Sequence, residues 1–276
     1  MTTTDRFLVA ADGTRLHLRR WAAEKRRATV VLVHGLGEHI GRYEHVATWF
    51  ASRGFSVAGF DQRGHGRSDG ARGALRAIDD PFTDLALVVD AVRADGRPLI
   101  LLGHSAGGAF AARFVVESRS VVDGLVLSSP ALAADLSTFQ RIQLAIGTLL
   151  APSLAQGNGL DANSISHDTA VVRAYREDPL VHDRVTARLA RAILDSGRVV
   201  SEAAPRWRVP TLLLYSGDDH LVASRGSDAF AAAAPRHVVE SERFDALYHE
   251  ILNEGAAAAP VYAHLERWLD ARVPRA

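Results

Sequence analysis

Short apolar runs alternate with amphipathic segments through most of the chain. Thr29–His34 reads TVVLVH and Pro98–Gly103 reads PLILLG, continuous runs typical of strands buried on both faces of a parallel sheet. Between such runs, apolar residues recur at helical spacing, as they do along Phe82–Ala94. The alternation predicts an α/β fold with helices on both faces of the sheet. The predicted strands are Phe7–Ala10 and Thr14–Trp21, joined as a hairpin through Asp12-Gly13, then Thr29–His34, Phe55–Phe60, Pro98–Gly103, Val122–Ser128, Pro210–Tyr215 and His237–Ser241.

The alternation stops after the sixth predicted strand and resumes near the C-terminus. Residues 131–205 contain helical patterns, a Pro-Ser break and a Gly/Asn-rich patch, and no convincing strand. We therefore expect a core domain made of residues 1–130 and 206–276, with a helical cap of residues 131–205 inserted into it. The helices expected in the core are Tyr43–Arg53, Phe82–Ala94, Ala106–Ser118, Arg225–Ala234 and Ala256–Asp270.

One segment of the expected cap has an apolar face with few charges. Two interpretations stay open for this face: packing on the core, or a lid over an acyl pocket that also touches lipid surfaces. Its residues are Leu136, Phe139, Ile142, Ile146, Leu149 and Leu150.

Composition narrows the class of protein. The 276 residues include 32 Lys plus Arg and 32 Asp plus Glu, so no net charge attracts nucleic acid, and no nucleic-acid partner is expected. The absence of cysteine excludes a thiol nucleophile and fits a reducing cytosol, so we expect a cytoplasmic protein. Neither an apolar signal core nor a membrane-spanning run is present, and no set of His, Asp and Glu with metal-ligand spacing indicates a metal site.

The segment Gly103–Gly107 reads GHSAG and matches the pattern G-x-S-x-G. It follows a predicted strand and precedes a predicted helix, which is the context of a nucleophile elbow. A serine on so sharp a turn projects its hydroxyl from the sheet, and the flanking glycines avoid clashes. Ser105 is therefore the candidate nucleophile, and the N–H of Ala106 is one candidate oxyanion donor. Leu36 supplies the second candidate N–H, because His34–Gly37 directly follows an earlier strand.

An acid and a histidine should follow the serine along the chain in this architecture. Asp218 and Asp219 come directly after the strand Pro210–Tyr215, and either carboxylate could orient the histidine. Among 12 histidines, His249 is singled out because it lies in the loop after the last predicted strand. These residues favour acyl-enzyme chemistry on an ester, with no cofactor. A non-catalytic binding protein on the same scaffold is a distant alternative.

Several segments together resemble the monoacylglycerol lipase family, which is close to lysophospholipases and serine-aminopeptidase-like hydrolases. They extend over nearly the whole chain: HGLGEHIGRYEHVA, FDQRGHGRSDG, GHSAGG, SHDTAVVRAYREDPLVHDR and YHEILNE.

The resemblance implies an α/β-hydrolase fold, with a mostly parallel eight-stranded sheet and a helical cap inserted after strand six. It selects Asp219 as the acid and implies substrate-binding positions at Glu38 and Arg42, near the glycerol end of a pocket. Ala106 departs from the methionine of many members, which implies a roomier pocket.

The expected reaction is the release of a fatty acid and glycerol from a small amphipathic ester. A general carboxylesterase or lysophospholipase with the same triad is the alternative. We expect the protein to make peripheral contact with membrane surfaces through the cap. Acyl-chain length and oligomeric state are left open by the sequence.

Overall fold

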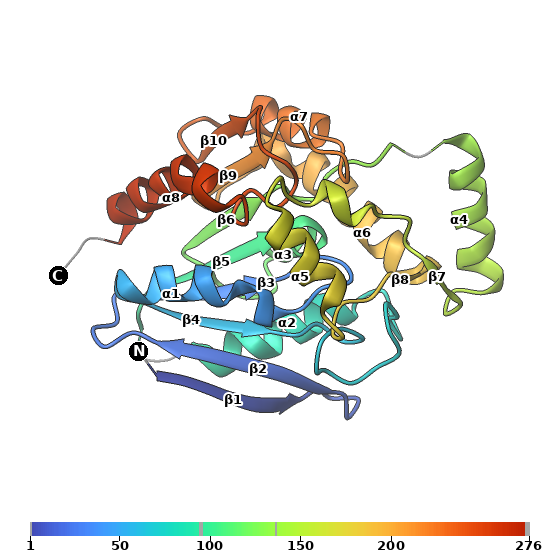
Figure 1. Ribbon diagram of the computed structural model, residues 1–276, viewed down its shortest axis with the longest axis horizontal. Helices are drawn as coiled ribbons and strands as arrows, with labels where there is room; N and C mark the ends of the chain where they lie inside the picture. Colours follow the sequence, from blue (N-terminus) through green and yellow to red (C-terminus); the bar gives the residue numbers. More distant parts are fainter. Residues whose placement is uncertain (1, 94–95, 136, 274–276) are drawn as a thin grey trace.

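One large sheet with helices on both sides organises the protein (Figure 1). The computed structural model describes residues 2–93, 96–135 and 137–273. The strand order is β1-β2-β4-β3-β5-β6-β9-β10; β2 is antiparallel to β1 and β4, and the other neighbours are parallel. The strands are β1 (Thr2–Val9), β2 (Arg15–Ala22), β3 (Ala28–Val33), β4 (Phe55–Phe60), β5 (Leu99–His104), β6 (Gly124–Ser128), β9 (Thr211–Ser216) and β10 (Val239–Phe244).

Two hydrophobic layers hold the helices to the sheet. One layer packs α1 and α8 on one face, and the other packs α2, α3, α6 and α7 on the opposite face. Every residue of β3 and of β5 is buried, as the apolar runs predict for strands covered on both faces. The helices of this core are α1 (Glu44–Ser52), α2 (Asp80–Val92), α3 (Ser105–Val116), α7 (Arg225–Ala233) and α8 (Ala259–Arg272), with 3₁₀ turns η1 (Ile40–Tyr43), η3 (Ala204–Arg206) and η4 (Gly255–Ala258).

The predicted elements match these within a few residues, and the differences have local causes. The first strand starts earlier than expected because the β-branched Thr2–Thr4 pair with the end of β2. The hairpin turn forms at Asp12-Gly13, where Gly13 has a φ of 85° and the Asp12 carboxylate accepts the Thr14 N–H at 3.0 Å. The predicted helix end at Ala94 lies outside the described residues.

The segment between β6 and β9 is mostly helical, but the prediction that it contains no strand is wrong. Two strands of three residues pair antiparallel there. So short a strand shows no alternation of apolar and polar positions, which is why the pattern missed it. The segment contains α4 (Thr138–Leu150), β7 (Ala155–Gly157), η2 (Ala162–Ser164), α5 (Thr169–Glu177), β8 (Arg184–Thr186) and α6 (Ala187–Ala203).

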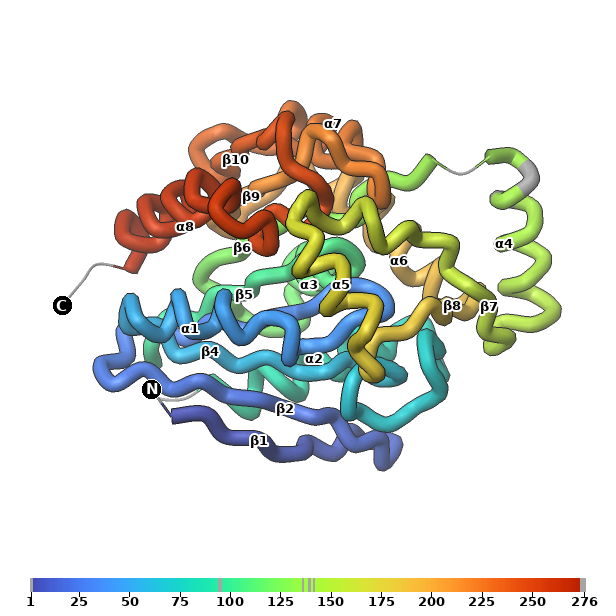
Figure 2. Tube along the Cα trace, in the orientation of Figure 1, coloured from blue at the N-terminus to red at the C-terminus, as the bar shows by residue number. Residues whose placement is uncertain are grey.

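Helix α4 projects at the side of the molecule, away from the sheet (Figure 2). Four apolar side chains of this helix are exposed: Ile142 and Ile146 each by 52%, Leu149 by 81% and Leu150 by 76%. For these four residues, packing on the core is therefore the wrong interpretation. Leu136 lies outside the described residues, as does the side chain of Phe139.

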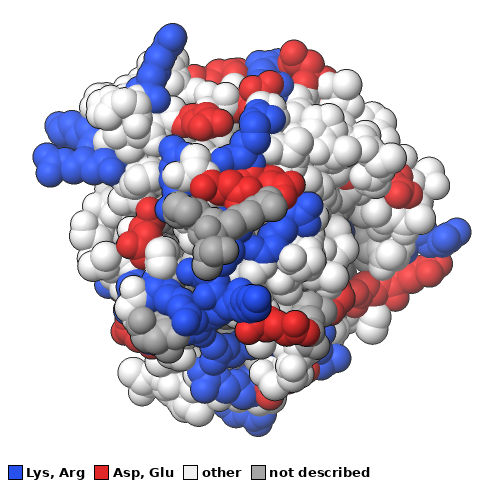
Figure 3. All heavy atoms as spheres, turned by 90° about the vertical axis from the view of Figure 1, so that its left-hand side faces the viewer, with Lys and Arg blue, Asp and Glu red and all other residues white. Residues whose placement is uncertain are grey.

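On the face of the molecule drawn in Figure 3, basic and acidic side chains are interspersed. Within the described ranges, no helix combines the length and apolar character needed to cross a membrane.

Candidate active site

Ser105 occupies a strained turn between β5 and α3. Its φ is 53°, a left-handed conformation that residues with a side chain rarely adopt. A Cβ on Gly103 would lie 2.6 Å from the Gly107 carbonyl oxygen, and a Cβ on Gly107 would overlap the carbonyl oxygens of Val33 and His34. Glycine is therefore required at both positions if the serine is to project from the end of the sheet.

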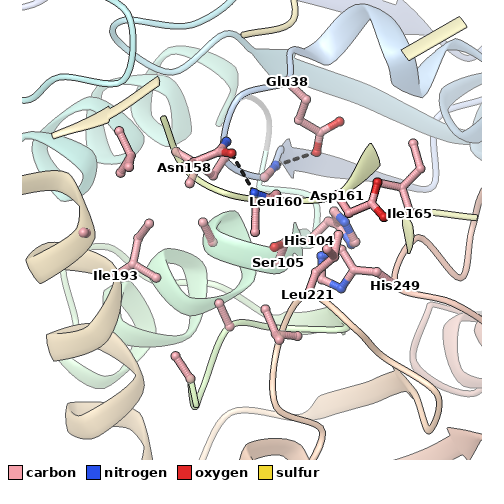
Figure 4. A pocket seen from close by; sticks show the side chains of 18 of the residues that line it. Glu38, His104, Ser105, Asn158, Leu160, Asp161, Ile165, Ile193, Leu221 and His249 are labelled. Carbon is pink, nitrogen blue, oxygen red and sulfur yellow. Dashed lines mark hydrogen bonds between the residues drawn. The ribbon is translucent and has the colours of Figure 1, made fainter. Parts of the chain in front are cut away.

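A cavity of about 320 Å³ opens beside Ser105. Figure 4 shows Ser105, His104 and His249 on one side of it and Ile193 on another. Most of the lining residues are apolar, and the acidic residues Glu38, Asp161 and Glu250 also line the cavity. The segment between β6 and β9 supplies much of the apolar wall, through Leu144, Leu160, Ile165, Val185, Ile193 and Leu194.

Asp219 contacts the imidazole of His249. The His249 Nδ1–H donates to Asp219 Oδ2 over 2.7 Å, and both side chains are buried. The other oxygen of Asp219 accepts the backbone N–H groups of Leu221 and Val222, both at 2.9 Å. Asp218 instead is half exposed and pairs with His220. Of the two neighbouring aspartates, only Asp219 is in position to orient His249.

Burial and neighbouring charge shift the pKa values of Asp219 and His249 in opposite directions. Burial alone would raise the pKa of Asp219, but His249 and the two N–H donors hold that pKa below its ordinary value. Burial alone would lower the pKa of His249, but Asp219, followed by Glu250 and Glu38, raises that pKa above 6.5. The ring is therefore more basic than an ordinary histidine.

Ser105 and His249 line the same cavity, but no hydrogen bond joins their side chains. Among the described residues, the only polar partner found for the His249 ring is Asp219. Hydrogen bonds between a nucleophile and its base are often loose before substrate binds, and they tighten in the complex.

Leu36 and Ala106 line the cavity near Ser105, and no intramolecular acceptor is found for either backbone N–H among the described residues. Ala106 lies in the first turn of α3, so its N–H has no acceptor within the helix. Leu36 lies in the loop after β3, and no acceptor for its N–H is found within the described part of the chain. Both residues line the cavity, and a Cβ built on Gly35 would lie 3.2 Å from Ser105 Cβ. The loop and the elbow are therefore in contact.

Glu38 and Arg42 form a buried network with a third residue, Glu250. Arg42 Nη1 donates to Glu38 Oε2 and to Glu250 Oε1, each at 2.7 Å, and its Nη2 donates to Glu250 Oε2 at 2.8 Å. Glu38 Oε1 also accepts the Gly35 N–H at 2.7 Å and the Tyr43 hydroxyl at 2.8 Å. Glu38 and Glu250 line the cavity, whereas Arg42 lies behind them. Although burial opposes its ionisation, the Arg42 guanidinium and two histidines hold the pKa of Glu38 at about 2.

A family profile described as serine aminopeptidase, S33, matches residues 24–256, well over half of the chain. The chain belongs to this family.

Relatives of the S33 chain include proteins named as lipases. It is 33% identical over 260 residues to a monoacylglycerol lipase of Mycolicibacterium smegmatis, with 92% of each chain covered. It is 34% identical to an uncharacterized abhydrolase domain-containing protein of Dictyostelium discoideum, but spans only 30% of that longer protein. The solved monoacylglycerol lipase of Paleococcus ferrophilus is 30% identical, with a TM-score of 0.86 and coverage of 93% of this chain and 99% of that one.

These similarities confirm three predictions: the resemblance to monoacylglycerol lipases, the α/β-hydrolase fold and a serine hydrolase. The S33 family member therefore has a mostly parallel eight-stranded sheet with helices on both faces.

Several residues around the site of this S33 protein escaped the sequence analysis. Glu250 directly follows His249, yet nothing local to YHEILNE indicates its pairing with Arg42. Tyr175, whose ring lies 4.7 Å from the Arg42 guanidinium, also lines the cavity. Contacts across such long sequence separations leave no periodic signal in the sequence. In the described parts of the chain, no cluster of three or more potential metal ligands is found.

Proposed function

We propose that this protein is a serine ester hydrolase that releases a fatty acid from a monoacylglycerol. The observation that carries the proposal is the mainly apolar cavity, which ends at a serine on a strained turn beside a histidine held by a buried aspartate. An apolar wall fits an acyl chain better than it fits the polar backbone of a peptide. The similarity to lipases supports the same substrate class.

The proposed reaction uses Ser105, His249 and Asp219 as a triad. Ser105 Oγ attacks the ester carbonyl carbon while its proton passes to His249 Nε2. The oxyanion that forms accepts the N–H groups of Leu36 and Ala106. The carbon–oxygen bond then breaks, and His249 gives its proton to the departing alcohol. Water attacks the acyl-enzyme, its proton passes to His249, and the fatty acid leaves as Ser105 regains its hydrogen.

We assign residues 131–205 as a cap over the cavity and residues 1–130 and 206–276 as the core. The apolar wall contributed by the segment between β6 and β9 supports this division. The exposed apolar side chains of α4 support peripheral contact between the cap and a lipid surface, from which an amphipathic substrate could enter.

The acidic residues that line the cavity should disfavour substrates with an anionic headgroup. Glu38, Glu250 and Asp161 line the cavity, whereas Arg42, which pairs with Glu38 and Glu250, does not line it. A phosphate placed there meets like charge, which costs several kcal/mol. We therefore expect kcat/KM for a monoacylglycerol to exceed that for a lysophosphatidate of the same acyl chain by about a hundredfold.

A panel of both substrate types, graded by acyl length, measures this selectivity. Asp161→Asn is the matched variant, since asparagine also caps a helical turn but carries no charge. This variant should reduce the ratio of kcat/KM for the monoacylglycerol to kcat/KM for the lysophosphatidate. Equal rates on both headgroups would favour the lysophospholipase alternative. Labelling by a fluorophosphonate, located on Ser105 by mass spectrometry, separates an enzyme from a binding protein.

The activity should depend on pH through His249, which must be neutral to accept a proton. Asp219, Glu250 and Glu38 raise the pKa of His249 above 6.5, so activity should fall as pH drops through that raised value. The acidic limb of kcat/KM, measured with a neutral ester, is therefore expected above pH 6.5. A limb below that pH would contradict the assignment of His249 as the base held by Asp219.

A further inference from the structure

A buried carboxylate outside the proposed triad joins the cap to the loop that carries His249. Glu254 is only 4% exposed. Its Oε1 accepts the Tyr248 N–H at 2.6 Å and lies 2.9 Å from His167 Nδ1. Its Oε2 accepts the His167 N–H at 2.9 Å and lies 3.1 Å from the Ser166 hydroxyl. Donors from two segments far apart in sequence therefore converge on one carboxylate.

Hydrogen bonds hold the two residues that flank His249. The N–H before it, on Tyr248, donates to Glu254, and the N–H after it, on Glu250, donates to the Ile165 carbonyl at 2.8 Å. The His167 ring also stacks on Tyr248, with ring centroids 3.6 Å apart. Glu254 therefore holds the residue before His249, and the Ile165 carbonyl in the cap holds the residue after it.

We propose that Glu254 is a positioning residue that aims His249 and couples it to the cap. This inference rests on the proposed role of His249 as the base. Ile165, which fixes the peptide after His249, also lines the cavity. An acyl chain that fills the cavity therefore presses on the same segment that holds the base.

The charge of Glu254 suits the donors around it. A carboxylate offers lone pairs to every donor, whereas glutamine would point its own N–H groups at the backbone N–H groups on one side. Alanine would leave the part-buried N–H groups of Tyr248 and His167 without this acceptor, which is costly. Glutamine keeps the shape and volume of glutamate, so it tests the hydrogen bonds with little change in packing.

The test compares Glu254→Gln and Glu254→Ala with the unaltered protein. The number of functional sites is titrated with a fluorophosphonate, and kcat is expressed per titrated site. A misdirected base is expected to lower kcat about tenfold for glutamine and about a hundredfold for alanine, with little change in KM. Glu117→Gln is the control, since Glu117 pairs with Arg113 and Arg119 away from the cavity and should leave kcat unchanged.

The pH profile gives a second readout that loss of stability alone would not move. If the ring is held less firmly on Asp219, its pKa falls, so the acidic limb of kcat/KM should shift to lower pH in both Glu254 variants. The charged and titratable groups that face the His249 ring, and that stay in place in these variants, are Asp219, Glu250, Glu38, Arg42 and His104.

Two results separate the inference from the proposed function. The positioning role would be overturned if both variants had fewer titratable sites but an unchanged kcat per site and an unchanged acidic limb. If the alanine variant does not fold, the isosteric Glu254→Gln variant decides alone. If the unaltered protein is not labelled at Ser105, the proposed function itself fails.

Discussion

Replacing Ser105 by alanine is expected to lower kcat for ester hydrolysis by roughly 10⁶-fold, the loss typical of a serine hydrolase without its nucleophile. Any residual rate would come from the oxyanion donors and from substrate binding. Alanine keeps the Cβ that already fits the turn at a φ of 53°, so the protein should fold normally. Hydrolysis of p-nitrophenyl esters measures the loss, and thermal unfolding verifies the fold.

Ser118→Ala is the matched control for this variant. Ser118 follows the end of α3, has a φ of 52° and is exposed, so it shares the unusual conformation but lies outside the cavity. Its replacement should leave the rate unchanged. Retention of full activity by Ser105→Ala would refute the proposed mechanism.

Replacing Arg42 by methionine is expected to lower the free energy of unfolding by about 3–5 kcal/mol. The buried guanidinium bridges Glu38 and Glu250, and its removal leaves two carboxylates close together without the arginine between them. The loss is measured by urea unfolding at neutral pH. Activity should fall as well, because Glu38 also accepts the N–H of Gly35 beside the oxyanion loop.

A triple variant tests the physical reason for this loss. Glu38→Gln and Glu250→Gln, added to Arg42→Met, remove the unpaired charges and should recover part of the lost stability. Arg198→Met is the surface control, because its pair with Glu202 is exposed on both sides and should contribute little. An Arg42→Met protein as stable as the Arg198→Met protein would contradict the prediction.

The core of the fold follows from local patterns, whereas the site does not. Four consecutive apolar residues in β3, Val30–Val33, predict a buried strand, and a serine between glycines predicts the elbow. The choice between Asp218 and Asp219 cannot be made from the pattern, because neighbouring carboxylates differ only in where the backbone directs them. The exposure of Leu149 was equally hidden, since an amphipathic pattern does not say what covers the apolar face. Glu254 left no signal because two of the residues that donate to it, Ser166 and His167, are distant in sequence.

The backbone contact at Gly107 leaves some positions of the enzyme free to accept substitutions and others not. The carbonyl groups of Val33 and His34 lie directly against this glycine. The loop with Leu36 and the turn with Ala106 therefore pack backbone against backbone, and any side chain at position 107 would separate them. Many apolar side chains that line the cavity come instead from the segment between β6 and β9, as Ile193 does. Under the proposed function, a preference for another acyl-chain length could therefore evolve, or be engineered, by substitutions in the cap that leave the contact at Gly107 unchanged.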